Sequence, residues 1–515
     1  MAAIKFGTSG WRGIISDEFT FYNVRLVTQS IVNYLRSEGI EGRGVVIGYD
    51  TRFLSREFAI TSSHVLSQNH IPVWLTNRDA PTPVISYHII KKKAGGGINF
   101  TASHNPAEYN GLKFSPSHGG PAEPEVTLRI EREIEKLTKI GYKWEPSPPG
   151  DKNVGENLWP IQEVISNPKK DRPSSSASGG GSNRVFDPIP EYITHIKTLI
   201  RMDILRKARL KVVIDCMHGT SRGYLDKILE ECGCSVKVLN DNLDPLFGGH
   251  RPEPARENIK GLKSEVVRWG ANIGLATDGD GDRFGIIDRD GTYITANQLI
   301  CLLFDYLIKT RNVRLGGRHK RRAERPPGRK VARSIATTSM VDAIAKRHGI
   351  EVIETPVGFK FIGPIISEGD CIIGGEESGG LSIGGHLPEK DGILACLLAA
   401  EMVAMEGRPI RDILERLSKE VGRFYAERLD LHLTQKAKES LLDMLETKPP
   451  KKITGVAVSR INRIDGFKLI LADGDWVLFR PSGTEPIVRI YLESHSKRKL
   501  KDMIVEVKKY ATICL

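Results

Sequence analysis

Three aspartates alternate with glycines in the segment DGDGDR, which places carboxylates at Asp278, Asp280 and Asp282 and a cation at Arg283. The glycines allow the backbone to fold tightly, so the three carboxylates can converge on one point. An all-oxygen ligand set of this kind suits Mg²⁺. The same spacing opens a calcium-binding EF-hand loop, but that loop needs glycine and glutamate where this chain has Arg283 and Arg289. We expect a magnesium site with Arg283 directed at a phosphoryl group, and an acidic turn without metal is the alternative.

A second group that could do chemistry is the hydroxyl of Ser103, in the segment TASHNP, residues 101–106. A short apolar strand is predicted at residues 98–100, so Ser103 is expected on a loop at a strand end. A serine alcohol is a weak nucleophile at neutral pH unless a base or a prior modification activates it. Lys113, ten residues downstream, is a candidate for that proton transfer. A plain turn is the alternative, because serine, asparagine and proline are common turn residues.

Two further segments combine groups that bind phosphate. In RPSGT, the Arg480 guanidinium, the Ser482 and Thr484 hydroxyls and the Gly483 N–H together match a phosphate dianion. Predicted strands flank this segment, which places it on a hairpin-type loop. Near the N-terminus, FGTSGWRG is rich in glycine and hydroxyl groups and contains Arg12, so it could set backbone N–H groups and a guanidinium against a phosphate. For both segments, a simple turn is the alternative.

The segment GEESG offers oxygen acceptors for sugar hydroxyls at Glu376 and Ser378. Adjacent side chains point in different directions, so Glu376 and Glu377 are poor candidates for a glycosidase pair, whose carboxyl groups must flank one bond. Lys360 and Lys390 lie near this segment in the sequence and are candidates for contacts with a second phosphate. The alternative is that both are ordinary surface lysines.

Predicted strands alternate with predicted helices along most of the chain, and the segments with candidate functional residues follow several of these strands. The predicted strands include residues 45–50, 73–75, 98–100, 211–215, 235–239, 272–276, 333–336, 351–354 and 371–373, and the predicted helices include residues 22–35, 56–67, 83–92, 221–231, 256–269, 297–309 and 340–347. This pattern favours a mainly parallel sheet with the chemistry at strand ends. Its recurrence suggests an internal structural triplication. From about residue 421, alternating apolar residues predict an antiparallel sheet with helices on one face.

The predicted organisation is three related mixed α/β domains followed by an α+β domain. Residues 171–185 contain a serine- and glycine-rich run that cannot bury a core, and we predict a flexible linker there. We expect the α/β domains at residues 1–170, 186–295 and 296–418, and the α+β domain at residues 419–515.

The net charge of +12 is concentrated in residues 311–333, where ten lysines and arginines accompany the single acid Glu324. We interpret this segment as a solvated basic loop, and a contact with a polyanion or another subunit is the alternative.

The longest apolar runs are too short to span a membrane and the first residues lack a signal-peptide pattern, so we expect a cytoplasmic protein. Seven cysteines without a CxxC pair predict free, buried thiols.

Four segments, in the order TASHNP, DGDGDR, GEESG and RPSGTEP, resemble those of the α-D-phosphohexomutase superfamily, which includes phosphoglucomutases and phosphomannomutases. The resemblance covers Phe6 to Glu493 and implies four domains around a central cleft. It also implies a hexose 1,6-bisphosphate intermediate, a phosphorylated Ser103, and Mg²⁺ held by Ser103, Asp278, Asp280 and Asp282. Catalytic roles are implied for Arg12, His104 and Lys113. Substrate contacts are implied for Arg283, Gly358, Lys360, Glu376, Ser378, Lys390, Arg480, Ser482, Gly483 and Thr484.

The resemblance predicts an intramolecular phosphotransferase that moves phosphate between the 1 and 6 positions of glucose. The GEESG segment is closer to the glucose-preferring pattern than to that of the glucosamine-phosphate enzymes. Specificity for mannose or glucosamine, a phosphatase-like hydrolase and a polyanion-binding protein are the alternatives. The expected partners are small sugar phosphates rather than membranes or nucleic acid, and we expect a monomer or a dimer.

Overall fold

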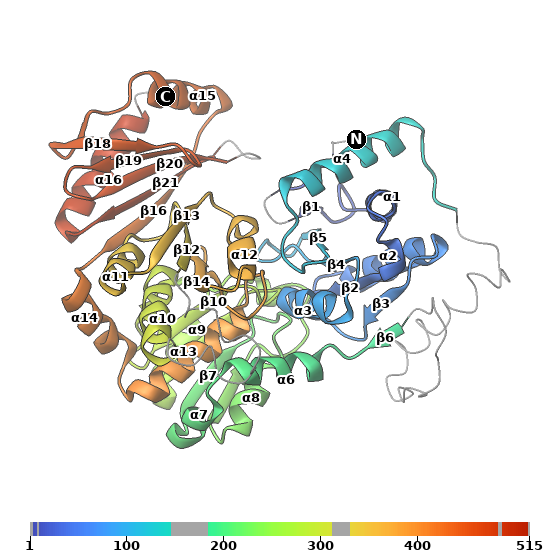
Figure 1. Ribbon diagram of the computed structural model, residues 1–515, viewed down its shortest axis with the longest axis horizontal. Helices are drawn as coiled ribbons and strands as arrows, with labels where there is room; N and C mark the ends of the chain where they lie inside the picture. Colours follow the sequence, from blue (N-terminus) through green and yellow to red (C-terminus); the bar gives the residue numbers. More distant parts are fainter. Residues whose placement is uncertain (1–3, 8–9, 146–183, 312–329, 483–486, 513–515) are drawn as a thin grey trace. The chain divides into compact units, whose positions relative to one another are not determined.

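The computed structural model describes residues 4–7, 10–145, 184–311, 330–482 and 487–512 (Figure 1). The chain divides into two compact units. The first unit comprises Met1–Thr295 and Gly379–Ile410, and the second unit comprises Ala296–Ser378 and Arg411–Leu515. The first two sheets of the chain belong to the first unit, and the C-terminal sheet belongs to the second.

The first sheet contains the predicted alternation of strands and helices, but its strands are not all parallel. Its order is β1-β5-β4-β2-β3-β6, in which β4, β2, β3 and β6 run parallel. β5 (Tyr109–Pro116) runs antiparallel to its neighbours β4 (Gly96–Phe100) and β1 (Trp11–Ile14). The serine segment therefore forms the connection between two antiparallel strands, and Lys113 on β5 lies opposite Asn99 on β4.

The other elements around this sheet follow the hydrophobic pattern of the sequence. The central strand β2 is buried along its whole length, and α1 buries the stripe Val24, Val27, Ile31 and Leu35 that repeats at helical spacing. The helix α4 was not predicted from the sequence. The bounds are β2 (Val45–Tyr49), β3 (Val73–Thr76), β6 (Arg184–Phe186), α1 (Phe21–Ser37), η1 (Glu41–Arg43), α2 (Ser55–Gln68), α3 (Thr82–Lys92) and α4 (Pro124–Lys139).

The second sheet repeats this arrangement around the aspartate segment. Its order is β11-β10-β9-β7-β8, with β9, β7 and β8 parallel and β10 antiparallel to β9. The three aspartates lie in the connection from β9 (Ile273–Thr277) to β10 (Phe284–Asp288). They therefore occupy the position in this sheet that the serine segment occupies in the first sheet.

Two helices of this region are shorter than predicted. The helix predicted at residues 221–231 begins at Leu225, because the preceding residues form a turn in which Gly223 has φ 84°. The helix predicted from residue 256 begins at Lys260. The bounds are β7 (Lys211–Asp215), β8 (Ser235–Leu239), β11 (Tyr293–Ile294), β15 (Gly380–Ile383), η3 (Phe247–Gly249), α6 (Ile189–Leu199), α7 (Met202–Ala208), α8 (Leu225–Glu231), α9 (Lys260–Trp269) and α13 (Gly392–Glu406).

Two segments have packing partners that the sequence did not predict. Residues 379–410 were expected with the segment 296–418, but they group with the first unit, where α13 packs against β9, β10 and α7. α13 is apolar on all sides and buried along most of its length, which explains why it needs these neighbours. Residues 171–183 of the predicted linker lie outside the described residues, and residues 184 and 185 belong to β6, which pairs with β3.

In the second unit, β12 (Lys330–Ser334) lies between β13 (Glu351–Thr355) and β14 (Cys371–Glu376), and both run parallel to it. β14 continues three residues beyond its predicted end, so Glu376 ends a strand. The C-terminal sheet, β16-β21-β20-β19-β18-β17, is antiparallel throughout, as predicted. The bounds are β16 (Tyr425–His432), β17 (Lys452–Ile453), β18 (Val456–Asn462), β19 (Phe467–Leu471), β20 (Trp476–Pro481), β21 (Ile487–Ser494), α10 (Ala296–Arg311), α11 (Met340–His348), α12 (Phe359–Ser367), α14 (Ile410–Val421), α15 (Gln435–Thr447) and α16 (Lys497–Thr512).

The structure bears on three predictions: those for the basic segment, for the cysteines and for the absence of a membrane span. Most of the basic segment, residues 312–329, lies outside the described residues. The six cysteines within the described part of the chain are free and buried, as predicted. None of the helices described here is both long enough and apolar enough to cross a membrane.

A buried histidine on α3 makes the stability of the first unit sensitive to acid. His88 is fully buried, its Nε2 lies 3.0 Å from the carbonyl oxygen of Pro188, and burial lowers its pKa to about 4. The unfolded chain, with a histidine pKa of about 6.5, binds the proton first as the pH falls, so stability is lost between pH 6.5 and 4. We expect His88→Gln to reduce this loss of unfolding free energy by roughly 2 kcal/mol.

Urea unfolding followed by circular dichroism at pH 6.5 and 4.5 checks this expectation. His250→Gln provides the matched control, because it makes the same substitution at an exposed position of the same unit. The same loss of stability in His88→Gln as in the wild type would contradict the explanation.

Candidate active site

Ser103 lies in the connection between β4 and β5 in a strained conformation. Its φ is 52°, in the left-handed region, and only 2% of the residue is exposed. Its Oγ donates a hydrogen bond to Oδ2 of Asp278 at 3.0 Å, and it lies 3.3 Å from Nδ1 of His104. Its backbone N–H donates to the Thr101 hydroxyl at 2.8 Å. The structure therefore brings the predicted serine to one of the three predicted metal ligands.

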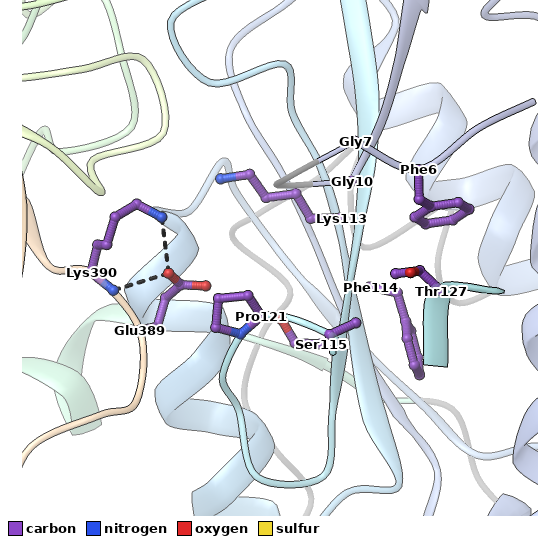
Figure 2. Close-up of a pocket in the computed structure, with 11 residues that line it drawn as sticks. Phe6, Gly7, Gly10, Lys113, Phe114, Ser115, Pro121, Thr127, Glu389 and Lys390 are labelled. Atoms are coloured by element: carbon purple, nitrogen blue, oxygen red, sulfur yellow. Dashed lines mark hydrogen bonds and ion pairs between the residues drawn. The ribbon is translucent and has the colours of Figure 1, made fainter. Parts of the chain in front are cut away.

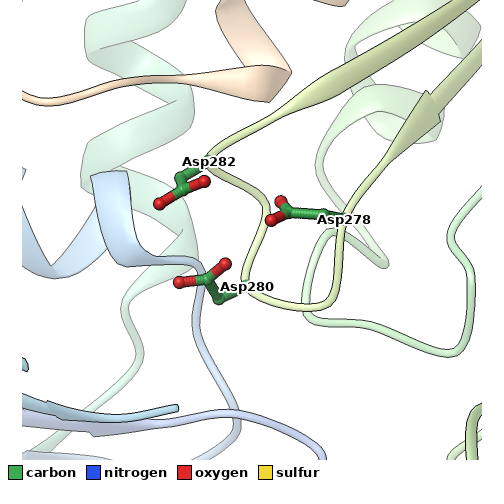
Figure 3. A group of neighbouring side chains, drawn as sticks. All are labelled: Asp278, Asp280 and Asp282. Carbon is green, nitrogen blue, oxygen red and sulfur yellow. The ribbon is translucent and has the colours of Figure 1, made fainter. Parts of the chain in front are cut away.

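The three aspartates converge as their spacing predicts (Figure 3). Asp278, Asp280 and Asp282 are all buried, and one carboxylate oxygen from each lies within 4.8 Å of the others. A side chain at Gly279 would place its Cβ 2.8 Å from the carbonyl oxygen of Ser103. Glycine at this position thus allows the serine and aspartate segments to touch.

The electrostatics of this cluster favour a bound cation. Burial, together with the charges of Asp282 and Asp280, raises the pKa of Asp278 well above its usual range. Among the described residues, the buried Oδ1 atoms of Asp280 and Asp282 have no hydrogen-bond partner. Buried carboxylate oxygens are costly unless a charge or a donor satisfies them. The residues present therefore fit a hard divalent cation such as Mg²⁺, which takes oxygen ligands.

Two lysines face the same carboxylates from the side of a pocket shown in Figure 2. Lys113 Nζ lies 2.5 Å from Asp280 Oδ2 and 3.0 Å from Asp282 Oδ2, and Lys390 Nζ lies 3.2 Å from Asp282 Oδ2. Although burial lowers it, the pKa of Lys113 is raised because Asp280 and Asp282 favour the ammonium form. Burial alone would raise the pKa of Asp282, but Lys113 and Lys390 hold it below its usual value. Glu389 contacts Lys390 Nζ at 3.1 Å.

Two arginines add positive charge beside the serine, and the histidine next to it is held neutral. Burial and the nearby Arg283 lower the pKa of Arg12 to about 10. Arg12 Nη1 donates to Asn105 Oδ1 at 2.6 Å, and Arg283 Nη1 lies 3.4 Å from Glu253. Burial, followed by the charges of Arg283 and Arg12, lowers the pKa of His104 well below its usual value. Guanidinium groups that repel one another in a buried region indicate an anionic ligand.

Sequence reasoning missed two residues that orient the aspartates. The Thr82 hydroxyl donates to Asp280 Oδ2 at 2.6 Å, and its backbone N–H donates to the carbonyl oxygen of Asp280 at 2.8 Å. Asn99 Nδ2 in turn donates to the Thr82 hydroxyl at 2.8 Å. A threonine at the start of α3 looks like an ordinary helix start, so the sequence carries no signal for this contact.

In the second unit, a different set of predicted residues comes together. Glu376 is 4% exposed, and its Oε1 accepts a hydrogen bond from the Gly358 N–H at 2.7 Å. Gly358 has φ 131°, which only glycine adopts readily. The Arg480 Nε donates to Asp465 Oδ2 at 2.7 Å, and the same carboxylate accepts from the N–H of Val357 at 2.9 Å. Asp465, which was not predicted, thus connects Arg480 to the segment that contains Gly358.

The remaining predicted residues of the second unit are placed less completely. Lys360 lies in the first turn of α12. Burial lowers its pKa, the charge of Asp465 acts to raise it, and the charge of Arg480 acts to lower it. Ser482 is 6% exposed and its carbonyl oxygen accepts from Lys438 Nζ at 2.5 Å. Ser378 directly follows the Glu376–Glu377 pair and is partly buried. Gly483 and Thr484 lie outside the described residues, although the strands β20 and β21 that flank them pair antiparallel, as expected.

The first unit therefore combines the groups that phosphoryl transfer requires. It supplies a serine oxygen, a cluster of carboxylates suited to a cation, and lysine and arginine side chains that can balance the charge of a phosphoryl group. The second unit holds a glutamate, a lysine and an arginine around one glycine-dependent backbone segment.

Comparisons with known proteins match nearly the whole chain. Family models described as "Phosphoglucomutase/phosphomannomutase, alpha/beta/alpha domain I", "domain II" and "domain III" match residues 3–140, 190–291 and 296–421, and the model of the C-terminal domain matches residues 436–509. A phosphoglucomutase/phosphomannomutase of Thermococcus kodakarensis is 30% identical, with 97% of this chain and 96% of the relative covered. A probable phosphoglucosamine mutase of Methanobrevibacter smithii is also 30% identical, with 98% of each chain covered.

A solved structure shows the same fold. The crystal structure of a putative phosphomannomutase from Thermus thermophilus is 29% identical, covers 99% of both chains and has a TM-score of 0.78. These matches, together with the serine, aspartate and C-terminal loop segments, show that the chain belongs to the phosphoglucomutase/phosphomannomutase family of phosphohexomutases.

Proposed function

We propose that this enzyme interconverts glucose 1-phosphate and glucose 6-phosphate, with Mg²⁺ as its metal and hexose 1,6-bisphosphate as the bound intermediate. The observation that carries the proposal is the 3.0 Å hydrogen bond between the Ser103 hydroxyl and Asp278 inside a cluster of three buried aspartates. A serine that contacts a potential metal ligand is in position to carry a phosphoryl group that a cation neutralises.

Asp278, Asp280 and Asp282, with an oxygen on Ser103, would hold the metal ion. Bound Mg²⁺ would stabilise the negative charge on the oxygens of the phosphoryl group during transfer. Arg12 and Arg283, which lie close enough to influence each other's charge, would contact the same phosphoryl oxygens. His104, which burial and the charges of Arg283 and Arg12 keep neutral, would form a hydrogen bond with the serine oxygen.

The proposed reaction moves one phosphoryl group away from Ser103 and another one back. The bond between phosphorus and the serine oxygen breaks as a bond from phosphorus to a sugar hydroxyl oxygen forms. Lys113, whose ammonium form Asp280 and Asp282 favour, would give a proton to the serine oxygen as it leaves phosphorus and would regain one from that sugar hydroxyl, so we propose it as the proton carrier. The bisphosphate then returns its other phosphoryl group to Ser103, which completes the isomerisation.

The second unit is proposed to hold the part of the substrate that does not react. Glu376 and Ser378 would accept hydrogen bonds from sugar hydroxyls, beside the backbone of Gly358. Lys360, Arg480, Ser482, Gly483 and Thr484 would bind the second phosphate, and Lys390 in the first unit would contact the reacting one. Binding energy from a remote phosphate can be used to orient the reacting end.

A side-by-side assay tests the function and the sugar preference. Glucose 1-phosphate, mannose 1-phosphate and glucosamine 1-phosphate are supplied with Mg²⁺ and a trace of the matching bisphosphate, and both the 6-phosphate product and free phosphate are measured. We expect kcat/KM for glucose 1-phosphate to exceed the other two by at least about tenfold, the scale set by polar contacts to a sugar hydroxyl.

Each other outcome identifies a different error. A higher kcat/KM for mannose or glucosamine would overturn the glucose assignment, which the names of the relatives leave open. Release of free phosphate faster than formation of any 6-phosphate would favour a hydrolase. No 6-phosphate from any of the three sugars would contradict the proposed function.

A further inference from the structure

A buried arginine that has no place in the proposed reaction lies directly beneath the serine segment. Arg52 follows β2, forms an ion pair with Asp50 at 3.0 Å, and both side chains are fully buried. The Phe247 ring lies 4.9 Å from its guanidinium carbon, where it makes a cation–π contact. Burying a charged pair is costly unless its remaining hydrogen-bonding groups are satisfied, so the contacts of this guanidinium need an explanation.

All five N–H donors of the Arg52 guanidinium are used. Nε donates to Asp50 Oδ2, and the other four donate to backbone carbonyl oxygens between Ser103 and Tyr109. Nη2 donates to Ser103 at 2.6 Å and to Asn105 at 2.7 Å. Nη1 donates to Pro106 at 2.6 Å and to Tyr109 at 3.0 Å.

This use of donors separates Arg52 from the arginines of the proposed site. Because every donor is engaged by the protein, Arg52 has none left for a phosphate. Its carbonyl partners span the segment from the serine to the start of β5, so one planar group fixes both ends of the loop. The carbonyl that it holds at Ser103 belongs to the residue with the left-handed φ of 52°. Strained backbone of this kind persists only where surrounding groups hold it.

The anchor of the guanidinium is itself held by several groups. Asp50 Oδ1 accepts hydrogen bonds from the Arg52 N–H at 3.0 Å and from the Ser55 hydroxyl at 2.7 Å. Ser55 also accepts from Asn110 Nδ2 at 2.9 Å, on the strand that follows the loop. The arginine is therefore fixed to the end of β2 and to the start of β5 at the same time.

We propose that Arg52 is a positioning residue, which holds Ser103 in the conformation that directs its oxygen at the aspartate cluster. A lysine at this position keeps the charge but has three donors on one atom, which cannot reach four separated carbonyl oxygens. The kinetic part of this inference rests on the proposed function, whereas the structural part concerns only the loop.

The test compares Arg52→Lys with a matched variant of another buried arginine. Arg333, in the second unit, contacts Asp342 at 2.7 Å and Glu354 at 2.6 Å and is 5% exposed. We expect Arg52→Lys to lower kcat about 100-fold, as a displacement of the reacting atom by about 1 Å does, while KM changes less than about threefold. Arg333→Lys should leave both kinetic constants near the wild-type values.

Hydrogen exchange provides a readout that does not depend on catalysis. The amide groups of Ser103, Asn105 and Tyr109 are hydrogen bonded within the loop and should exchange slowly. We expect peptides that cover residues 101–109 to exchange at least about tenfold faster in Arg52→Lys, and at the wild-type rate in Arg333→Lys. Unchanged exchange in Arg52→Lys, or a folded Arg52→Lys enzyme with wild-type kcat, would overturn the proposal.

Two further results distinguish a failure of the proposed function from a failure of the inference about Arg52. If wild-type protein isomerises no hexose phosphate, the proposed function fails, and the exchange measurement still decides whether Arg52 holds the loop. If Arg52→Lys does not fold, Asp50→Asn decides, because it removes the charged anchor and leaves the arginine in place. We expect faster exchange of residues 101–109 in that variant, and wild-type exchange would overturn the proposal.

Discussion

Ser103→Ala is expected to lower kcat by at least about 10³-fold, because removal of a covalent nucleophile eliminates the route through the phosphorylated enzyme. Ser103 donates a hydrogen bond to Asp278 and is almost fully buried, and alanine leaves no hydroxyl at this position. The variant lacks only one oxygen atom. It should therefore fold and still bind glucose 1-phosphate.

The measurement combines steady-state kinetics with equilibrium binding of glucose 1-phosphate. Ser63→Ala on α2 is the matched control, because Ser63 is also buried and its hydroxyl donates within its own helix, to the Ile60 carbonyl oxygen at 2.7 Å. That variant should retain wild-type kcat. Turnover in Ser103→Ala close to that of Ser63→Ala would contradict the assignment of Ser103 as the phosphoryl carrier.

Asp278→Asn is expected to lower Mg²⁺-supported turnover by at least about 100-fold, because even partners that only orient a metal ligand affect metal affinity by 10- to 100-fold. The substitution preserves the shape of the side chain. The oxygen of an amide can accept from the Arg283 N–H, which donates to Asp278 Oδ1 at 2.9 Å. Its NH₂ group can donate a hydrogen bond to the Ser103 hydroxyl oxygen, which now contacts Asp278 Oδ2. The loss would therefore report the missing charge rather than a disrupted loop.

The same substitution should not reduce stability in metal-free buffer. Burial and the charges of Asp282 and Asp280 disfavour the ionised form of Asp278, which its raised pKa reflects. Removing that charge relieves repulsion within the cluster, so we expect an equal or higher unfolding free energy for Asp278→Asn.

Turnover as a function of Mg²⁺ concentration, together with thermal unfolding in the presence of a chelator, checks both expectations. The matched control is Asp288→Asn, which changes another fully buried aspartate in the same sheet, outside the cluster. It should lose stability and keep its Mg²⁺ dependence. Wild-type turnover in Asp278→Asn at the same Mg²⁺ concentration would contradict the proposed metal site.

The convergence of the aspartates was predictable because it depends on local spacing. Glycines between the three carboxylates fix what the backbone can do within five residues, and the structure shows that geometry. The positions of most strands were predictable for a similar reason. Residues 45–49 and 235–239, for example, are short apolar or alternating runs whose periodicity is a local property.

The contacts between segments were not predictable from local pattern. β5 pairs antiparallel with β4 and so brings Lys113 to the aspartates, but its sequence contains glycine, asparagine and proline and lacks a clear alternation. Thr82 and Asp465 each contact a partner that lies more than 100 residues away in the sequence, Asp280 and Val357 respectively. Arg52 likewise binds carbonyl oxygens, which every residue offers, so its role leaves no signature in the identity of its partners.

The packing of residues 379–410 shows the same limit at a larger scale. The apolar pattern of α13 predicts that it is buried, yet it does not say against which sheet. Its neighbours in the first unit, β9, β10 and α7, are decided by long-range packing. Sequence continuity placed α13 in the third α/β segment, and the family model of domain III likewise spans residues 296–421, whereas by packing α13 groups with the first unit.

The most direct test of the account follows one labelled phosphoryl group. The enzyme is incubated with Mg²⁺ and glucose 1,6-bisphosphate that carries radiolabelled phosphate, and it is then chased with unlabelled glucose 1-phosphate. The account predicts one label per chain, on the peptide that contains Ser103, followed by its transfer to the sugar. Label on another residue, or its release as free phosphate during the chase, would contradict phosphoryl transfer through Ser103.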